Sequence, residues 1–186
     1  MPFTTTEFPG LLLFEPAVYK DERGYFFESY NEQVFEKEGI DIRFVQDNQS
    51  FSRYGVIRGL HYQLDPHGQT KLIRVLQGTI LDVAVDLRKG SPTFGQYIAV
   101  ELSAENKKQF LIPAGFAHGF SVLSETAEVS YKCDAFYNKE SEAGIRYDDS
   151  TLEIDWLVPL EKVIVSTKDV DLPDFADCRN NFQFKG

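Results

Sequence analysis

The sequence predicts an all-β fold, an antiparallel sandwich or barrel with a few short helices. Hydrophobic and polar residues alternate along many short segments, with the period of two that is typical of half-buried strands. Aromatic residues make up 14% of the chain, and flat rings pack well on pleated sheets. With 186 residues, of which 42% are hydrophobic and 26% charged, the chain has ordinary globular composition. We expect one domain over residues 1–186.

About ten short strands are expected at regular spacing, and such strands close into a barrel that can hold a small ligand. We expect them at residues 11–14, 24–30, 43–47, 56–62, 70–76, 81–87, 96–102, 109–112, 119–123 and 128–134. Gln77-Gly78 lies between two alternating runs and predicts a tight hairpin turn. One short helix is expected after Asn31 as its N-cap, ending near Glu38 with Gly39 as the stop.

The charge and cysteine content exclude several classes of protein. Lys and Arg number 19 against 29 Asp and Glu, which gives a net charge of -10. Such a surface repels nucleic acid backbones and anionic membranes, so we expect neither as a partner. Two cysteines without a CxxC pair argue against a disulfide framework or a thiolate zinc site. The first ten residues lack the features of a signal peptide and no apolar run could span a bilayer, so we expect a cytoplasmic protein.

Several polar residues stand where the alternation would place apolar side chains. His61, Lys71 and Tyr131 each share a strand face with hydrophobic residues. A polar group that points into a barrel is either hydrogen-bonded or functional, so a buried network and a functional site both stay open. Strict alternation also puts Arg58 and His61 on opposite faces. A bulge at Gly59 would turn both to one side; alternatively, Arg58 reaches the site from a strand end.

Two motifs resemble those of the cupin superfamily. Pro113–Gly119, which contains His118, has the spacing of the second cupin motif, and Gly55 followed by His61 resembles the start of the first. Metal-binding cupins have a second histidine two residues after the first, and Gln63 occupies that position here. Two histidines without a third ligand make a poor site for iron, manganese or zinc. The resemblance implies a cupin-like antiparallel jelly-roll barrel without a metal.

Longer segments match one family in order, from about Pro9 to Pro173. They are Arg58–Gln63, Lys71–Val75, Asp82–Arg88, Gly90–Gly95, Pro113–Phe120, Tyr131-Lys132 and Ser166–Asp169. Through them the chain closely resembles the dTDP-4-dehydrorhamnose 3,5-epimerases. The resemblance implies an isomerase of dTDP-L-rhamnose synthesis that epimerises C3 and C5 of dTDP-4-dehydro-6-deoxy-D-glucose, beside the C4 ketone. That chemistry needs no cofactor, and the chain has no Gly-rich dinucleotide loop.

The same resemblance implies roles for individual residues. His61 resembles the family's base and Asp169 the carboxylate that fixes its tautomer, while Lys71 would stabilise the enolate oxygen. Tyr131 resembles the acid that returns a proton from the opposite face. Contacts to the nucleotide and sugar are expected from Arg23, Glu28, Gln46, Asn48, Arg58, His118, Tyr137, Glu142 and Lys168. Among these, the arginines and lysine suit the diphosphate and Tyr137 suits stacking on thymine.

The family is typically a homodimer whose N-terminal strands pack on the partner, which would place Arg23 and Glu28 in the neighbour's pocket. Other functions stay open: a C3-only epimerase or ketoisomerase of a related dTDP-4-keto-6-deoxyhexose, a metal-dependent cupin oxygenase, and a non-catalytic sugar-nucleotide binding module. Retention of both His61 and Tyr131 favours an epimerase, and Gln63 argues against the oxygenase. The tail, Phe175–Gly186, departs from the family and suggests no function.

Overall fold

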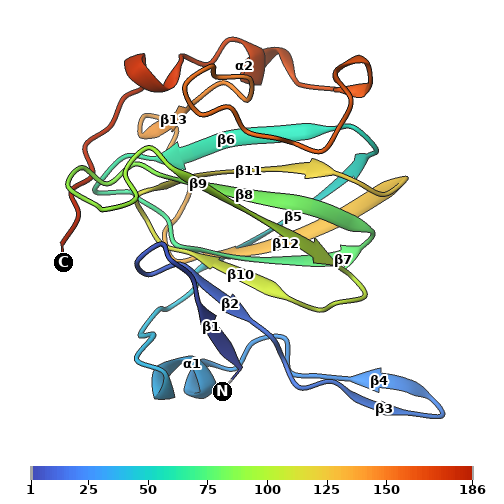
Figure 1. Cartoon of the computed structure of the whole chain (residues 1–186). Coiled ribbons are helices and arrows are strands. Elements are labelled where there is room, and N and C mark those ends of the chain that lie inside the picture. Colours follow the sequence, from blue (N-terminus) through green and yellow to red (C-terminus); the bar gives the residue numbers. More distant parts are fainter. Residues whose placement is uncertain (1, 186) are drawn as a thin grey trace.

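Two antiparallel sheets pack face to face in a jelly-roll barrel, and the computed structural model describes residues 2–185 (Figure 1). The strands are β1 (Phe3–Thr5), β2 (Leu12–Phe14), β3 (Tyr19–Asp21), β4 (Gly24–Phe26), β5 (Gln46–Arg53), β6 (Ile57–Gln63), β7 (Lys71–Gln77), β8 (Thr79–Asp86), β9 (Tyr97–Ser103), β10 (Gln109–Ile112), β11 (Phe116–Val122), β12 (Thr126–Cys133) and β13 (Glu142–Gly144). The helices are α1 (Glu32–Lys37) and α2 (Thr167–Val170), with two 3-10 turns, η1 (Leu160–Lys162) and η2 (Phe175–Asp177). The predicted all-β, cupin-like architecture is confirmed.

The six-stranded sheet has the order β1-β2-β10-β7-β12-β5, and the five-stranded sheet the order β13-β6-β11-β8-β9. Strands β7 and β8 therefore belong to different sheets and do not pair with each other. The prediction of a hairpin turn at Gln77-Gly78 is wrong. The turn is a corner at which the chain crosses from one sheet to the other. Gly78 has a φ of +79°, and a Cβ there would lie 2.0 Å from the Thr126 carbonyl oxygen. A corner and a hairpin give the same sequence signal, because both place glycine between two alternating runs.

Two hydrophobic clusters lie on the two faces of the five-stranded sheet. The cluster between the sheets contains Ile80 and Ala84 of β8, together with residues of both sheets. The second contains Leu81, Val83 and Val85 and is covered on the outside by the chain from residue 145 to 182, which crosses over β6 in Figure 1. The alternation predicted for residues 81–87 is thus observed. Both faces of β8 are buried, one against the opposite sheet and one against the C-terminal segment.

The N-terminal region adds a short helix and a protruding hairpin. Asn31 caps α1 by accepting a hydrogen bond from the Gln33 N–H, and Gly39 follows the helix with a φ of +78°, as predicted. The β3–β4 hairpin extends away from the body of the molecule (Figure 1). The strand expected at 24–30 is confined to β4, because within the described residues 2–185 this hairpin pairs with no third strand. No helix among residues 2–185 has the length and apolar character needed to cross a membrane.

A buried carboxylate organises the loop after β8. Asp86 is fully buried and accepts hydrogen bonds from the Arg88 guanidinium at 2.7 and 2.9 Å. The hydroxyls of Ser91 and Thr93 donate to the same carboxylate at 2.6 and 2.7 Å. Burial alone would raise the pKa of Asp86, but these donors outweigh it and the pKa is lowered. The loop is therefore held by an ionised group with partners for both of its oxygens.

We predict that Asp86→Asn lowers the free energy of unfolding by about 3–5 kcal/mol, because it leaves the Arg88 charge without its buried partner. Urea unfolding at neutral pH measures the loss. The control is Asp148→Asn, which breaks a pair with Arg146 in which both side chains are well exposed, and it should cost less than about 1 kcal/mol. Equal losses in the two variants would contradict the prediction.

Candidate active site

A cavity of about 640 Å³ opens between the two sheets. One wall comes from β5, β7 and β12 of the six-stranded sheet and the other from β6 and β11 of the five-stranded sheet, while α2 covers the rim. All of the residues predicted for the site line this cavity except Arg23 and Glu28. The lining residues that were predicted are Gln46, Asn48, Arg58, His61, Lys71, His118, Tyr131, Tyr137, Glu142, Lys168 and Asp169.

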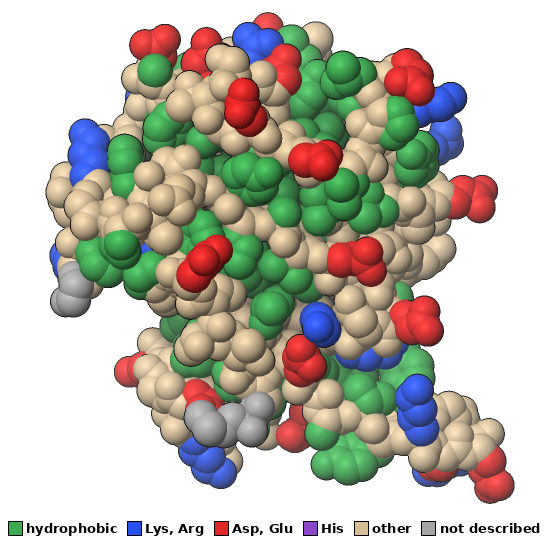
Figure 2. All heavy atoms as spheres, viewed as in Figure 1, with side chains coloured by type: hydrophobic (Ala, Val, Ile, Leu, Met, Phe, Trp, Pro, Cys, Tyr) green, Lys and Arg blue, Asp and Glu red, His purple; other side chains and the backbone are tan. Residues whose placement is uncertain are grey.

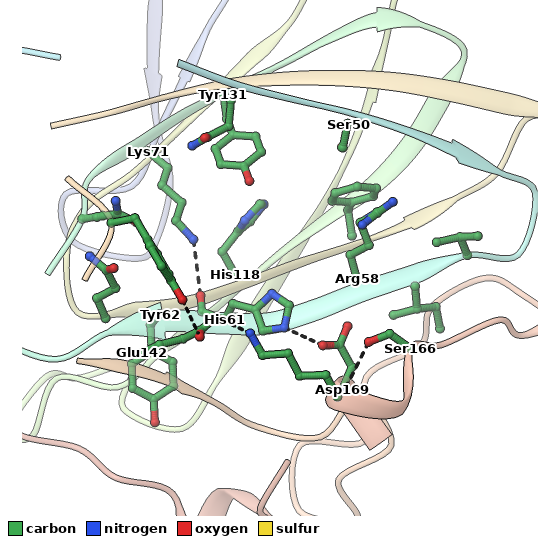
Figure 3. A pocket seen from close by; sticks show the side chains of 18 of the residues that line it. Ser50, Arg58, His61, Tyr62, Lys71, His118, Tyr131, Glu142, Ser166 and Asp169 are labelled. Atoms are coloured by element: carbon green, nitrogen blue, oxygen red, sulfur yellow. Dashed lines mark hydrogen bonds and ion pairs between the residues drawn. The ribbon is translucent and has the colours of Figure 1, made fainter. Parts of the chain in front are cut away.

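An imidazole and a carboxylate from distant parts of the chain meet at one wall. The Nε2 atom of His61, on β6, lies 2.8 Å from Oδ1 of Asp169, on α2 (Figure 3). Oδ2 of Asp169 accepts from the Gly59 N–H at 3.3 Å, and the Asp169 N–H donates to the N-cap, Ser166. Burial would raise the pKa of Asp169, but the hydrogen bonds from His61 and Gly59 lower it. An ionised carboxylate accepts the Nε2 proton, which leaves the Nδ1 lone pair of His61 facing the cavity.

A bulge in β6 brings Arg58 and His61 to the same side. In the pairing with β11, His61 lies opposite His118 and Arg58 opposite Phe120, so β6 has one extra residue in this interval. This decides between the two alternatives in favour of the bulge at Gly59. Gly59 has a φ of +124°, and a Cβ there would lie 2.5 Å from the Gly119 Cα.

Arg58 is held at the cavity by the edge of the opposite sheet. Its Nε donates to Ser52 Oγ at 2.9 Å and its Nη2 to the Phe51 carbonyl at 3.3 Å. Both acceptors lie on β5, so the guanidinium spans the gap between the sheets. Because the remaining N–H groups of the side chain are free to bind an anion, Arg58 can serve a diphosphate from this position.

The opposite wall supplies a phenol and an amine. Tyr131 on β12 points its hydroxyl across the cavity toward β6, and Lys71 on β7 lies beside it (Figure 3). Burial raises the pKa of Tyr131, so its phenol keeps the proton near neutral pH. The Lys71 Nζ donates to the His61 carbonyl at 3.4 Å. Burial lowers the pKa of Lys71, and the charges of Cys133 and Asp82 oppose that shift.

A second histidine–carboxylate pair lies next to the first, and its carboxylate was not among the predicted site residues. His118 Nε2 is 2.8 Å from Oδ1 of Asp82 on β8, and both side chains are buried. Oδ2 of Asp82 has no hydrogen-bond partner among residues 2–185. Burial lowers the pKa of His118, although Asp82 opposes it. The signal was present in the sequence, because the alternation puts Asp82 on the inward face with Ile80 and Ala84.

Polar side chains form a network at the rim of the cavity. Glu142 on β13 accepts from the Tyr137 hydroxyl at 3.0 Å and from Lys168 Nζ at 2.6 Å. On β5, the Gln46 Oε1 accepts from the Tyr137 backbone N–H at 3.0 Å, and the Gln46 Nε2 donates to Asn48 Oδ1 at 3.0 Å. The ring of Tyr137 is therefore oriented through its hydroxyl and its backbone while one side stays exposed.

Arg23 and Glu28 do not reach the cavity of their own chain. Arg23 lies at the turn of the β3–β4 hairpin, where it pairs with Asp21 at 2.5 Å. The Glu28 carboxylate accepts a hydrogen bond from Asn31 at 3.1 Å. In Figure 2 the hairpin protrudes from the body, with hydrophobic side chains in the angle where it leaves.

Comparison with known proteins agrees with this geometry. The family model described as dTDP-4-dehydrorhamnose 3,5-epimerase matches residues 5–177. The chain belongs to this family. It is 53% identical to the dTDP-4-dehydrorhamnose 3,5-epimerase of Shigella flexneri over 173 residues, which cover 92% of this chain and 94% of the relative. The resemblance seen in the sequence motifs is thus confirmed, and the chain is an isomerase.

Solved structures of the epimerase family superpose closely on this chain. The Elizabethkingia anophelis NUHP1 dTDP-4-dehydrorhamnose 3,5-epimerase gives a TM-score of 0.90 at 55% identity, over 94% of this chain and 96% of that one. The Legionella pneumophila dTDP-6-deoxy-D-glucose-3,5-epimerase, solved with dTDP-4-keto-L-rhamnose, gives a TM-score of 0.90 at 50% identity, over 94% of this chain and 93% of that one.

Within residues 2–185, no three His, Cys, Asp or Glu side chains converge in a way that could hold a metal ion.

We predict that Asp169→Asn destabilises the fold by about 1–3 kcal/mol between pH 5 and 7. The folded-state pKa of Asp169 is lowered, so its contribution is complete above the unfolded pKa of about 3.9 and fades as the pH falls through the folded value. The stability difference between wild type and variant, from urea unfolding at several pH values, should therefore shrink between pH 4 and 3.

The matched control for this prediction is Asp47→Asn, because Asp47 is exposed and forms a surface ion pair with Lys132. That variant should differ little from wild type at any of these pH values. A stability difference for Asp169→Asn that stays constant down to pH 3 would mean that its carboxylate is not held ionised by His61 and Gly59.

Proposed function

We propose that this chain epimerises C3 and C5 of dTDP-4-dehydro-6-deoxy-D-glucose to give dTDP-4-dehydro-L-rhamnose. The observation that carries the proposal is the placement of two proton-transfer groups on opposite walls of one cavity, His61 on β6 and Tyr131 on β12. Epimerisation needs a base on one face of the sugar and an acid on the other. The names of the relatives and the ligand of the Legionella enzyme support the same substrate.

The first half of the reaction breaks a C–H bond next to the ketone. The Nδ1 atom of His61 takes the proton from C3 or C5, and the ionised Asp169 stabilises the imidazolium that forms. The electrons of the C–H bond pass to the C4 oxygen and give an enolate. Lys71 stabilises that oxygen by donating an N–H hydrogen bond; burial lowers the pKa of Lys71, and the neighbouring Asp82 opposes that shift.

The second half returns a proton to the other face of the same carbon. The enolate collapses to the ketone as the carbon takes the proton of the Tyr131 hydroxyl, and the configuration is inverted. A buried phenol is a suitable donor, because its raised pKa keeps it protonated until the strongly basic enolate is formed. Solvent then reprotonates Tyr131 and accepts the proton of His61, so the enzyme returns to its starting state.

The nucleotide end is bound by the rim of the cavity. Arg58 and Lys168 bind the diphosphate, Gln46 and Asn48 bind polar edges of the nucleoside, and Tyr137 stacks on the thymine. His118, held by Asp82, contacts the sugar-diphosphate as a ligand residue. The chain acts in the cytoplasm as one catalytic domain.

The site is completed by a second copy of the chain. Tyr19, Tyr25 and Phe26 of the β3–β4 hairpin expose 67, 58 and 67% of their surface, which is unusual for aromatic residues of an isolated protein. We place this hairpin on the partner subunit of a homodimer, where Arg23 and Glu28 enter the neighbour's cavity. The protrusion of the hairpin in Figure 2 supports this arrangement.

We predict that His61→Ala lowers the rate of solvent deuterium incorporation at C3 and C5 of the ketosugar nucleotide by about 10²- to 10⁴-fold. Proton NMR in deuterated water follows both carbons separately. Tyr131→Phe should still allow proton loss but should lower the yield of inverted product, since only its return step is removed. The third histidine provides the control: His67→Ala, outside the cavity, should exchange at close to the wild-type rate. Wild-type exchange at C3 without C5 would point instead to a C3-only epimerase.

The dimer is tested by mixing two impaired variants. A hybrid of Arg23→Ala and His61→Ala subunits should contain one intact site, because His61 of the first subunit would meet Arg23 of the second. Hybrids purified through two affinity tags after co-expression should therefore regain about half of the wild-type sites at low substrate concentration. If Arg23 served its own chain, no hybrid site would be intact and mixing would restore nothing. A monomer in light scattering would also contradict the proposal.

A further inference from the structure

The buried side-chain amide of Gln63 forms hydrogen bonds with the backbone of two loops, one that contains His67 and one that contains Tyr137. It lies on β6, two residues after His61, and is 4% exposed. Its Nε2 donates to the His67 carbonyl at 2.7 Å and to the Phe136 carbonyl at 3.3 Å, and its Oε1 accepts from the Asn138 N–H at 2.6 Å. Both N–H groups of this amide and one lone pair of its oxygen are therefore used to hold backbone.

The contacted backbone groups lie on both sides of Tyr137. Gln63 binds the carbonyl of the residue before Tyr137 and the N–H of the residue after it. The same amide reaches the carbonyl of His67 in the loop between β6 and β7. One side chain on a sheet strand therefore fixes the peptide groups that carry the Tyr137 ring and ties them to the neighbouring loop.

This loop has little hydrophobic anchoring of its own. Phe136 is 69% exposed and Tyr137 is 55% exposed, so burial of these rings does not hold the segment in place. Its position depends on polar contacts from three glutamine side chains, of which Gln63 is one. The Gln46 Oε1 accepts a hydrogen bond from the Tyr137 N–H at 3.0 Å, and the Gln69 Nε2 donates to the Ala135 carbonyl at 2.8 Å. Of these three amides, Gln63 alone lies on the strand that carries the candidate base.

We propose that Gln63 is a positioning residue that sets the placement of the Tyr137 ring relative to His61. The inference rests on the proposed function, in which Tyr137 stacks on the thymine. His61 and Gln63 lie two residues apart on one strand, which corresponds to about 7 Å along a rigid element. β6 thus fixes the distance between two parts of the site. It carries His61 directly, and through the Gln63 amide it holds the loop that carries the Tyr137 ring.

The test uses Gln63→Met, which keeps the volume of the side chain and removes its hydrogen bonds. Calorimetric titration with dTDP should show an affinity about tenfold weaker than wild type, because the Tyr137 ring is no longer held in position to stack on the thymine. The KM for the ketosugar nucleotide should rise by a similar factor, while kcat at saturation should stay within about threefold, because the His61 and Tyr131 contacts are untouched.

A double-mutant cycle shows whether Gln63 acts through Tyr137. Tyr137→Ala alone should weaken dTDP binding by at least as much as Gln63→Met. If Gln63 serves only to place that ring, adding Gln63→Met to Tyr137→Ala should cause less than about a twofold further loss. A full additional loss in the double variant would overturn the inference, as would wild-type affinity in Gln63→Met alone.

The control is Asn180→Ala, another amide whose two ends bind backbone, the Leu87 carbonyl and the Phe182 N–H, outside the cavity. It should lower thermal stability without changing dTDP affinity. If Gln63→Met does not fold, Gln63→Asn, which keeps the amide but shortens its reach, enters the same cycle. Failure of the wild-type protein to bind dTDP would refute the proposed function, whereas unchanged binding in the Gln63 variants would refute only the inference.

Discussion

The geometry of the cavity depends on one extra residue in β6. Between His61 and Arg58 this strand has two intervening residues where β11 has one, and Gly59 is the residue that makes the insertion possible. With regular alternation, one of these two side chains would point into the outer hydrophobic cluster, where a charge has no partner. The bulge also frees the Gly59 N–H from the ladder, and that N–H donates to Asp169. A single irregularity thus orients His61, which we propose as the base, Arg58, which we propose as a diphosphate-binding residue, and the Asp169 carboxylate that pairs with His61.

Burial then assigns protonation states to the groups in the cavity. Removal from water disfavours every charged form, so it raises the pKa of Tyr131 and lowers those of His118 and Lys71. Asp169 responds in the opposite way, because the hydrogen bonds that it accepts from His61 and Gly59 outweigh its desolvation and lower its pKa. The result is a neutral phenol facing an imidazole that is backed by an ionised carboxylate. The two groups differ in their surroundings: burial governs the phenol of Tyr131, whereas the His61 side chain is about one-third exposed and is paired with a buried carboxylate.

The sequence predicted the strands well where apolar residues alternate, and poorly elsewhere. The strands expected at 56–62, 70–76, 96–102 and 109–112 lie within a residue or two of β6, β7, β9 and β10. β5 was largely missed, since the expected segment 43–47 overlaps only its start. Its sequence, QDNQSFSR, shows almost no apolar alternation, because Gln46, Asn48 and Ser50 line the cavity and the other face, which includes Phe51, is exposed. The sheet change at Gly78 was also missed, because alternation carries no information about which sheet a strand joins.

The site was predictable to different degrees for a similar reason. Polar residues at inward positions identified His61, Lys71 and Tyr131 from periodicity alone, and the same rule applied to β8 would have found Asp82. Asp169 could come only from the family resemblance, because no periodic pattern connects a residue in a four-residue helix with a strand more than a hundred positions earlier. Asp169 and His61 are brought together by tertiary packing, which the local sequence of neither segment predicts.

That packing is carried by the C-terminal segment as a whole. Ile145, Leu152, Trp156 and Phe182 bury themselves on the outer face of the five-stranded sheet and hold the chain against it. Just before α2, the Ile164 backbone exchanges hydrogen bonds with Gly55 and Ile57 at the start of β6, at 2.9 Å each. Because these hydrogen bonds fix the chain just before α2, the helix lies along the rim of the cavity, where Asp169 contacts His61. Asp169, the partner of the proposed base, is therefore positioned by hydrophobic burial on the far side of the sheet, and the geometry of the candidate site depends on the outer cluster as well as on the cavity.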